Sequence, residues 1–167
     1  TPTSDFTLTE YYDSPLNRIE SVTPPSWYPT IYTYSNDGGF TIDGVTFSAS
    51  SLAVTTVTDP ENIESISFTD KLGRAVLSEV KEGSESAKTY TLYDDKNRVE
   101  SVLPPDVSAA SSALAFRYQY DGADNILAKH IPDMGWTNYL YNQRNLMTAS
   151  QDPKLLSEGK WLTNIYD

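Results

Sequence analysis

His130 is the only histidine of the chain, so any catalytic triad with a histidine base would have to be built around it. Such a base needs an orienting acid and a nucleophile beside it. His130 precedes Ile131-Pro132 at the end of an expected strand, which indicates a structural residue at the rim of a sheet. Zinc needs three or four ligands, and one histidine without cysteine supplies too few of the usual kind. We therefore expect no catalytic residue, no metal site and no cofactor.

Two acidic clusters could offer oxygen ligands to Ca²⁺, namely Asp94-Asp95 and the segment 121–125. Neither cluster has the spacing of a dedicated calcium loop, and turn capping by aspartate explains both without an ion. A glycoside hydrolase needs two carboxyl groups about 5 to 10 Å apart in a cleft. Because the prominent acids all fall at expected turns, a hydrolytic enzyme is the least favoured class.

Trp27, Trp136 and Trp161, together with the tyrosines, could form a platform on which sugar rings stack. The competing explanation is packing within a sheet. In the segment 116–120, aromatic and polar residues alternate, as expected for rings layered across adjacent strands. Packing is the favoured explanation, and sugar stacking is kept as the alternative.

The acids and amides recur in one setting: an aromatic strand, a turn led by Asp or Asn, a second strand and, in most copies, a proline. Asp can accept backbone N–H bonds where a turn begins, and Asn or Gly tolerates the left-handed conformation of a short hairpin loop. A proline after the return strand removes a ladder donor and separates one hairpin from the next. The residues predicted to form these turns are Asp13, Asn17, Arg18, Asp70, Gly73, Arg74, Asp94, Asn97, Arg98, Asp121, Asn125, Asn142 and Asn145.

From residue 70 onward the turn-leading residues follow one another at intervals of 21 to 27 positions, the last being Asp167. An earlier interval of 57 residues separates Asp13 from Asp70, and we predict two more hairpins within it. One would turn at 36–39 between strands at 30–34 and 40–45, and the other would turn at 59–62 between strands at 52–58 and 63–68. We therefore divide the chain into divergent repeats with an insertion (1–65) and regular repeats (66–167) that end within a repeat.

One short helix is expected at 154–158, with Asp152 as its N-cap, Pro153 at its first position and Gly159 as its terminator. The Ser/Ala-rich stretch 107–113 is either a loop or a weak helical turn. The fold class is therefore all-β, with tandem antiparallel hairpins in a curved, extended sheet that is open or shell-like.

The Tyr-Asp units with Asn-Arg or Gly-Arg a few positions on, such as Tyr93-Asp94 with Asn97-Arg98, resemble the YD repeats of the Rhs (rearrangement hotspot) family. The likeness covers roughly the whole chain and is strongest over residues 68–167, whereas residues 26–65 match the repeat pattern poorly. The resemblance implies a long antiparallel sheet that spirals into a hollow shell, which in toxin-associated relatives encloses a toxic domain. Relatives that cleave themselves use an aspartyl-protease-like core segment, which has no match in this chain, so self-cleavage is not carried over.

The charge of the chain, −11 from 12 basic and 23 acidic residues, repels nucleic acids and anionic lipid headgroups. No apolar stretch is long enough to cross a bilayer, so we expect neither nucleic-acid binding nor membrane insertion. The start at Thr1 without Met predicts a fragment of a longer protein.

Together these features predict a non-catalytic wall segment of a secreted or surface-exposed bacterial protein, acting in encapsulation, adhesion or cell-surface interaction. Its partners would be the rest of the parent repeat chain, another protein or glycans, or another copy through open strand edges. The alternative is a carbohydrate-binding module.

Overall fold

The computed structural model of the chain describes residues 5–36 and 38–166. Strands hold 50% of these residues and helix 3%, so the predicted all-β class is confirmed. Twelve strand pairs have a described register, and each of them is antiparallel. Asp37, within the predicted turn 36–39, and Asp167, which leads the last predicted repeat, lie outside the described residues.

Two compact units divide the chain, Thr1–Thr89 and Tyr90–Asp167. The predicted division at 65/66 rests on the regularity of the repeats and stays a prediction. In the first unit the sheet order is β1-β2-β3-β6-β7-β8, followed by the start of β9, with β4 and β5 in a separate sheet. The strands are β1 (Leu8–Tyr11), β2 (Ile19–Thr23), β3 (Thr30–Ser35), β4 (Phe40–Ile42), β5 (Val45–Phe47), β6 (Ala53–Thr58), β7 (Ile63–Thr69), β8 (Ala75–Glu82) and β9 (Glu85–Tyr93).

The predicted hairpin with strands at 30–34 and 40–45 is wrong. β3 pairs with β6 over five residue pairs, and β4 pairs with β5. The turn between β4 and β5 is formed by Asp43 and Gly44, which both have positive φ (48° and 78°), as a two-residue hairpin turn of type I′ requires. Residues 40–47 therefore fold on themselves as an insertion, and β3 is left to pair with the next long strand.

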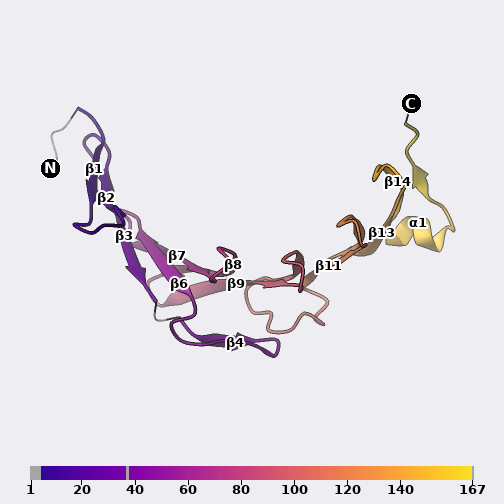
Figure 1. The fold of residues 1–167 in the computed structure, drawn as a ribbon, viewed down its shortest axis with the longest axis horizontal. Helices are drawn as coiled ribbons and strands as arrows, with labels where there is room; N and C mark the ends of the chain where they lie inside the picture. The colour runs from indigo at the N-terminus through magenta and orange to yellow at the C-terminus, as the bar shows by residue number, and fades with distance from the viewer. Residues whose placement is uncertain (1–4, 37, 167) are drawn as a thin grey trace. The chain divides into compact units, whose positions relative to one another are not determined.

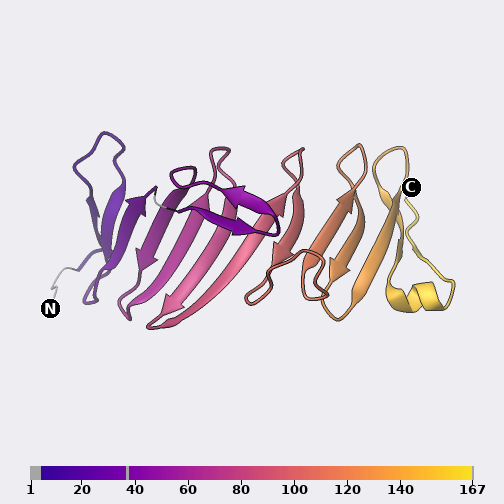
Figure 2. The same ribbon diagram turned by 90° about the horizontal axis from the view of Figure 1, so that it is seen from below.

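The inserted hairpin covers part of one face of the first unit's sheet, and Figure 2 shows it lying across the strands. Its Phe40 ring contacts Phe68 of β7 edge-on, with centroids 6.2 Å apart. Ile42 and Leu52 are buried with Val54, Ile66, Val76 and Leu77. The insertion thus supplies the second layer that a sheet needs to bury one of its faces.

In the second unit, the end of β9 and the later strands lie in the order β9-β10-β11-β12-β13-β14-β15. The unit's core lies on one face of this sheet and contains Leu92, Leu103, Val107, Ala115, Ala128 and Ala149. Val107 and Ala115 belong to the loop between β10 and β11. The strands are β10 (Val99–Leu103), β11 (Phe116–Tyr120), β12 (Ile126–Ile131), β13 (Gly135–Tyr141), β14 (Met147–Gln151) and β15 (Leu162–Thr163).

Helix α1 (Pro153–Ser157) confirms the predicted short helix, shifted by one residue at each end. The Asp152 carboxylate caps it by accepting the Leu155 N–H at 2.7 Å, and Gly159 follows it with φ of 65°. The helix lies beside β13 and β14 (Figure 1). Stretch 107–113 contains turns and bends and no helix.

Candidate functional site

The same turn geometry recurs where Asp or Asn leads a hairpin. In the turn led by Asp94, the Oδ1 atom accepts the N–H groups of Lys96 and Arg98 at 2.9 Å each. The Asp94 N–H donates to the Arg98 carbonyl at 2.9 Å, and the Asn97 N–H donates to the Asp94 carbonyl at 3.0 Å. Asn97 has φ of 65°, the left-handed conformation that Asn tolerates.

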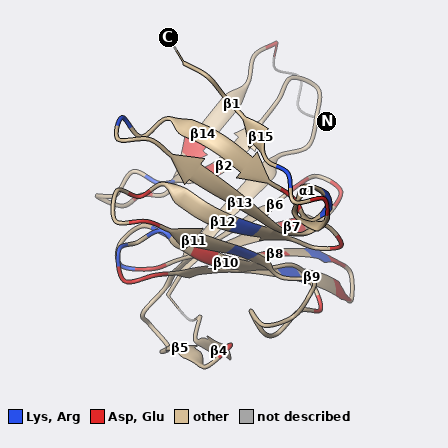
Figure 3. Ribbon diagram, turned by 90° about the vertical axis from the view of Figure 1, so that its right-hand side faces the viewer, with Lys and Arg blue, Asp and Glu red and all other residues tan. Residues whose placement is uncertain are grey.

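Four other turns repeat this set of bonds, led by Asp59, Asp70, Asp121 and Asn142. Four of the five turns, all except the one led by Asp59, have a β-bulge where the strands enter the turn. A bulge of this kind strengthens the local twist of a hairpin and fixes its register. Figure 3 shows many of the charged residues in turns at the strand ends.

The pKa values of three turn carboxylates, those of Asp70, Asp94 and Asp121, are lowered, which favours their charged form. Burial by itself raises the pKa of Asp70, but hydrogen bonds from the Arg74 N–H, the Arg74 side chain and the Leu72 N–H outweigh it and lower the pKa below 3.8. The pKa of Asp94 is lowered in the same way, against burial, by bonds from Arg98 and Lys96. For Asp121 the side-chain and backbone bonds from Asn125 lower the pKa.

Arginine completes two of the turns. The Arg74 Nε donates to Asp70 Oδ2 at 2.8 Å, and the Arg98 Nε donates to Asp94 Oδ2 at 2.7 Å. Asn125 has the equivalent place in the third turn, where its Nδ2 donates to Asp121 Oδ2 at 2.9 Å. The left-handed residue of that turn is Asp124, with φ of 68°, so the prediction that Asn125 takes the left-handed position is wrong. In the turn led by Asn142, Asn145 is left-handed as predicted.

The first predicted turn is built differently. The Asn17 N–H donates to the Ser14 carbonyl at 3.1 Å, so Ser14 has the place that Asp94 has in the regular turn, and Asp13 lies one residue earlier. The loop closes through the Tyr12 N–H, which donates to the Arg18 carbonyl at 2.9 Å. The prediction that Asp13 leads a regular turn is therefore wrong, because the loop is two residues longer.

Arginine and tyrosine join one hairpin to the next. The Arg98 guanidinium carbon lies 4.5 Å from the centroid of the Tyr120 ring, and the Tyr120 hydroxyl donates to the Val99 carbonyl at 2.7 Å. Arg18 lies 4.8 Å from the centroid of Tyr34, whose hydroxyl donates to the Ile19 carbonyl at 3.2 Å. In both places the accepting carbonyl belongs to the residue after the arginine.

A tyrosine near the end of the chain makes the matching bond without an arginine. The Tyr166 hydroxyl donates to the Met147 carbonyl at 2.8 Å. Met147 follows Asn142 by five positions, as Val99 follows Asp94. The tyrosine-to-carbonyl contact therefore recurs in both units.

Successive turns of the second unit also contact one another. Arg98 Nη1 donates to the Asp121 carbonyl at 3.0 Å and to Asp124 Oδ1 at 2.7 Å. Asn125 Nδ2 donates to Asn145 Oδ1 at 3.1 Å. These side chains, which sequence reasoning assigned to single turns, therefore bridge neighbouring turns.

His130 is buried in the second unit, with 7% of its surface exposed, so the expectation of a residue at the rim is wrong. Its Nδ1–H donates to the Ala115 carbonyl at 2.8 Å, which holds the end of the loop between β10 and β11. Ser101, Arg117, His130 and Trp136 lie opposite one another in register across β10 to β13. Ser101 Oγ and Arg117 Nε are buried without hydrogen-bond partners.

The three tryptophans differ in their surroundings. Trp136 packs against His130, with ring centroids 5.3 Å apart, and against Arg117, whose guanidinium carbon lies 5.0 Å from the ring centroid. Trp27 of the first unit and Trp161 of the second are 56% and 40% exposed. Trp136 therefore has a packing role, and the other two remain available for stacking.

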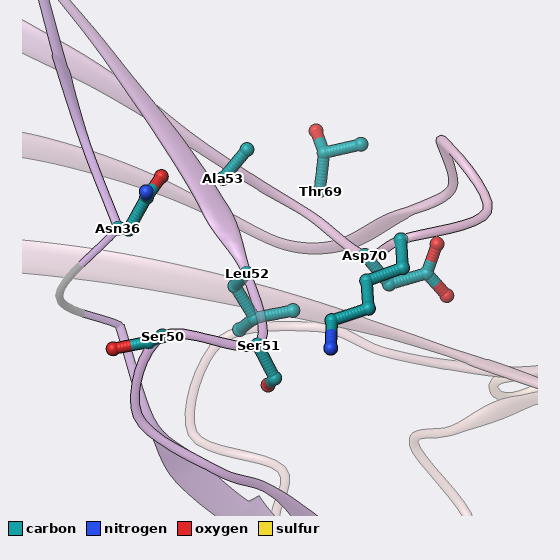
Figure 4. A pocket seen from close by; sticks show the side chains of 8 residues that line it. Asn36, Ser50, Ser51, Leu52, Ala53, Thr69 and Asp70 are labelled. Atoms are coloured by element: carbon teal, nitrogen blue, oxygen red, sulfur yellow. The ribbon is translucent and has the colours of Figure 1, made fainter.

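A hollow of about 200 Å³ in the first unit is shown in Figure 4. Its Asp70 side chain is already bound to Arg74 and to backbone N–H groups, so it offers little to a ligand. A groove of about 380 Å³ is formed by the first loop and β3.

Metal binding has no candidate cluster among the residues that the structure describes. Within 5–36 and 38–166, no group of three or more His, Asp or Glu side chains could hold a metal ion. Asp94 and the acids of 121–125 serve the turns described above. Among the residues described, no helix has the length and apolar character needed to cross a membrane.

Compared with models of known protein families the chain matches none, and a comparison with curated proteins gives no significant match.

Proposed function

We propose that this chain is a non-catalytic structural and interaction module of the YD-repeat type, a wall segment of a larger bacterial surface or secreted protein that acts by extending a β-sheet. The observation that supports this most is the recurring contact between a tyrosine hydroxyl and the return strand of the preceding hairpin. Tyr34, Tyr120 and Tyr166 make it at three places in the chain. A unit that positions its successor by the same contacts can be repeated, as in other repeat proteins.

Encapsulation, adhesion and cell-surface interaction are the roles that such a wall would serve. The likeness of the Tyr-Asp units to Rhs repeats supports this assignment and the location in the bacterial envelope. Hairpins repeated in this way would form a curved wall that is either open or shell-like. The charge of −11 keeps such a surface away from nucleic acids.

Strand edges are the part of this proposal that can be tested in the isolated chain. β15 is the last strand in the order of the second unit's sheet, and its Leu162 is 61% exposed, followed by Ile165 at 93%. An uncovered edge with apolar side chains is a template for pairing with another strand. We expect concentration-dependent association of the chain in sedimentation velocity.

Matched variants distinguish pairing through the β15 edge from nonspecific hydrophobic association. Leu162→Lys with Ile165→Lys places charges at the β15 edge and should suppress association, whereas Leu156→Lys on helix α1, at a residue 57% exposed, should leave association intact. A chain that stays monomeric at every accessible concentration contradicts pairing through open edges.

Carbohydrate binding is the second candidate, favoured by the exposure of Trp27 and Trp161. Flat rings of this kind cover the apolar faces of sugars. A glycan-array screen of the chain and its Trp27→Ala and Trp161→Ala variants tests this candidate. An array without hits removes it.

A further inference from the structure

The groove of the first unit has the features of a small-ligand site. It is about 380 Å³ in volume, within the range of ligand pockets, and it lies between the loop 12–18 and β3. Its lining combines aromatic, apolar and charged side chains, and it is open to solvent. The lining residues are Tyr12, Asp13, Ser14, Leu16, Arg18, Thr33 and Tyr34.

The aromatic part of this groove is held in place by its own contacts. The rings of Tyr12 and Tyr34 meet edge to face, with centroids 6.1 Å apart at 76°. Both hydroxyls are fixed on backbone carbonyls, that of Tyr12 on Tyr32 at 2.9 Å and that of Tyr34 on Ile19. The two rings are therefore already ordered in the folded chain, so a ligand would bind them with little further loss of side-chain conformational entropy.

Arg18 and Asp13 differ from their counterparts in the regular turns. At Asp94 and Arg98 the carboxylate and the guanidinium are bound to each other at 2.7 Å, and Arg98 also binds Asp124. In the described part of the chain, neither Asp13 nor Arg18 forms an ion pair. The two extra residues of the first loop thus leave one acceptor and one planar donor facing the same groove, with the guanidinium placed by Tyr34 at 4.8 Å.

A neutral saccharide fits this combination of an acceptor, a planar donor and an aromatic surface in the groove. Each sugar hydroxyl both donates and accepts, so neighbouring hydroxyls can donate to Asp13 and accept from the fork of Arg18. The apolar face of a hexose suits Leu16 and the tyrosine rings. An acidic saccharide is disfavoured by Asp13 and by the overall charge of −11.

We infer that the groove lined by Tyr12, Asp13, Arg18 and Tyr34 binds about one or two rings of a neutral hexose oligosaccharide. This site deepens the carbohydrate-binding candidate and is independent of sheet extension. It differs from the alternative drawn from the sequence, a stacking platform of Trp27, Trp136 and Trp161 with the tyrosines, because no tryptophan lines the groove.

The test uses isotope-labelled full chain and three probes, the β-linked tetrasaccharides of glucose, mannose and galactose. We expect at least one of them, at millimolar concentration, to shift backbone amide signals of residues 12–18 and 33–34. Asp13→Asn and Arg18→Gln should each weaken that binding about tenfold, because each replaces charge-assisted hydrogen bonds to the sugar hydroxyls with weaker neutral ones.

The matched controls lie in the regular turn. Asp94→Asn and Arg98→Gln change the same residue types outside the groove and should leave the affinity unchanged, as should Trp27→Ala. The absence of shifts with all three probes overturns the inference, and so does an affinity unaffected by Asp13→Asn. Association in sedimentation velocity is a separate measurement, so failure of this site leaves sheet extension standing.

Discussion

Arg98 covers the ring of Tyr120 at 4.5 Å, although the two residues belong to different hairpins. The tyrosine hydroxyl donates to the carbonyl of Val99, next to the arginine. Burial, followed by Tyr118 and Asp94, raises the pKa of Tyr120, so the hydroxyl remains a donor at neutral pH. One pair of side chains thus determines how the turn at 94–98 lies against the following strand.

Tyr120→Phe removes this hydroxyl and keeps the ring. We expect the free energy of unfolding to fall by about 0.5–1.5 kcal/mol, because the Val99 carbonyl loses its partner while the contact with Arg98 remains. Urea unfolding followed by tyrosine and tryptophan fluorescence measures this change. Tyr118→Phe, on the same strand, is the control, and equal losses in both variants would contradict a specific role for the Tyr120 hydroxyl.

Acid should destabilise the chain through its turns. The pKa values of Asp70, Asp94 and Asp121 are lowered on folding, so their contribution to stability is complete above the ordinary value near 3.8 and is lost as the pH falls through the folded-state values. We expect the free energy of unfolding to decrease progressively below about pH 4. Urea unfolding between pH 2 and 7 checks this.

Asn142 supplies the matched variant for the acid effect, because it accepts the same two backbone N–H bonds without a charge. Asp121→Asn should therefore keep the turn and reduce the acid dependence. If the triple variant with Asn at 70, 94 and 121 loses stability in acid as steeply as the parent chain, the turn carboxylates are not responsible.

Gly73→Ala tests the left-handed position of the turn led by Asp70. Gly73 has φ of 80°, and a Cβ atom placed there would meet nothing within 4 Å, so the cost is backbone strain alone. We expect a loss of about 1 kcal/mol in unfolding free energy. Gly73→Asn should lose less, because Asn97 and Asn145 adopt this conformation in the equivalent places.

The control for Gly73 is Gly122→Ala in the turn led by Asp121, where a Cβ atom also meets nothing within 4 Å and no positive φ is required. Its stability should stay within about 0.5 kcal/mol of the parent chain. Thermal unfolding followed by circular dichroism measures both variants, and a Gly73→Ala variant as stable as Gly122→Ala would refute the strain argument.

His130→Ala should release the loop between β10 and β11. The Ala115 carbonyl would lose its bond, and Trp136 would lose a packing partner, which together should cost about 1–3 kcal/mol. Hydrogen exchange of residues 104–115 should accelerate more than that of the strands. Lys129→Ala, at the neighbouring position of β12, is the control, and an unchanged loop in His130→Ala would show that the bond does not hold it.

Local chemistry alone determined the regular turns and the helix. Asp70, Asp94 and Asn142 bond to backbone groups within four residues, and Asp152 caps a helix that begins at the next residue. Contacts of this range depend on residue type and spacing, which are visible in the sequence. The all-β class and the hairpin with turn 59–62 could be predicted for the same reason.

Tertiary structure decided which strands pair and which side chains remain available. β3 pairs with β6, although the inserted hairpin separates these strands in the sequence. The buried His130 bonds to Ala115, 15 positions earlier, and Arg98 bonds to Asp124, 26 positions later. The groove beside Arg18 arises because a longer loop separates Asp13 from the position that binds arginine elsewhere. Such outcomes depend on packing between distant segments, where burial of apolar surface outweighs local turn preference.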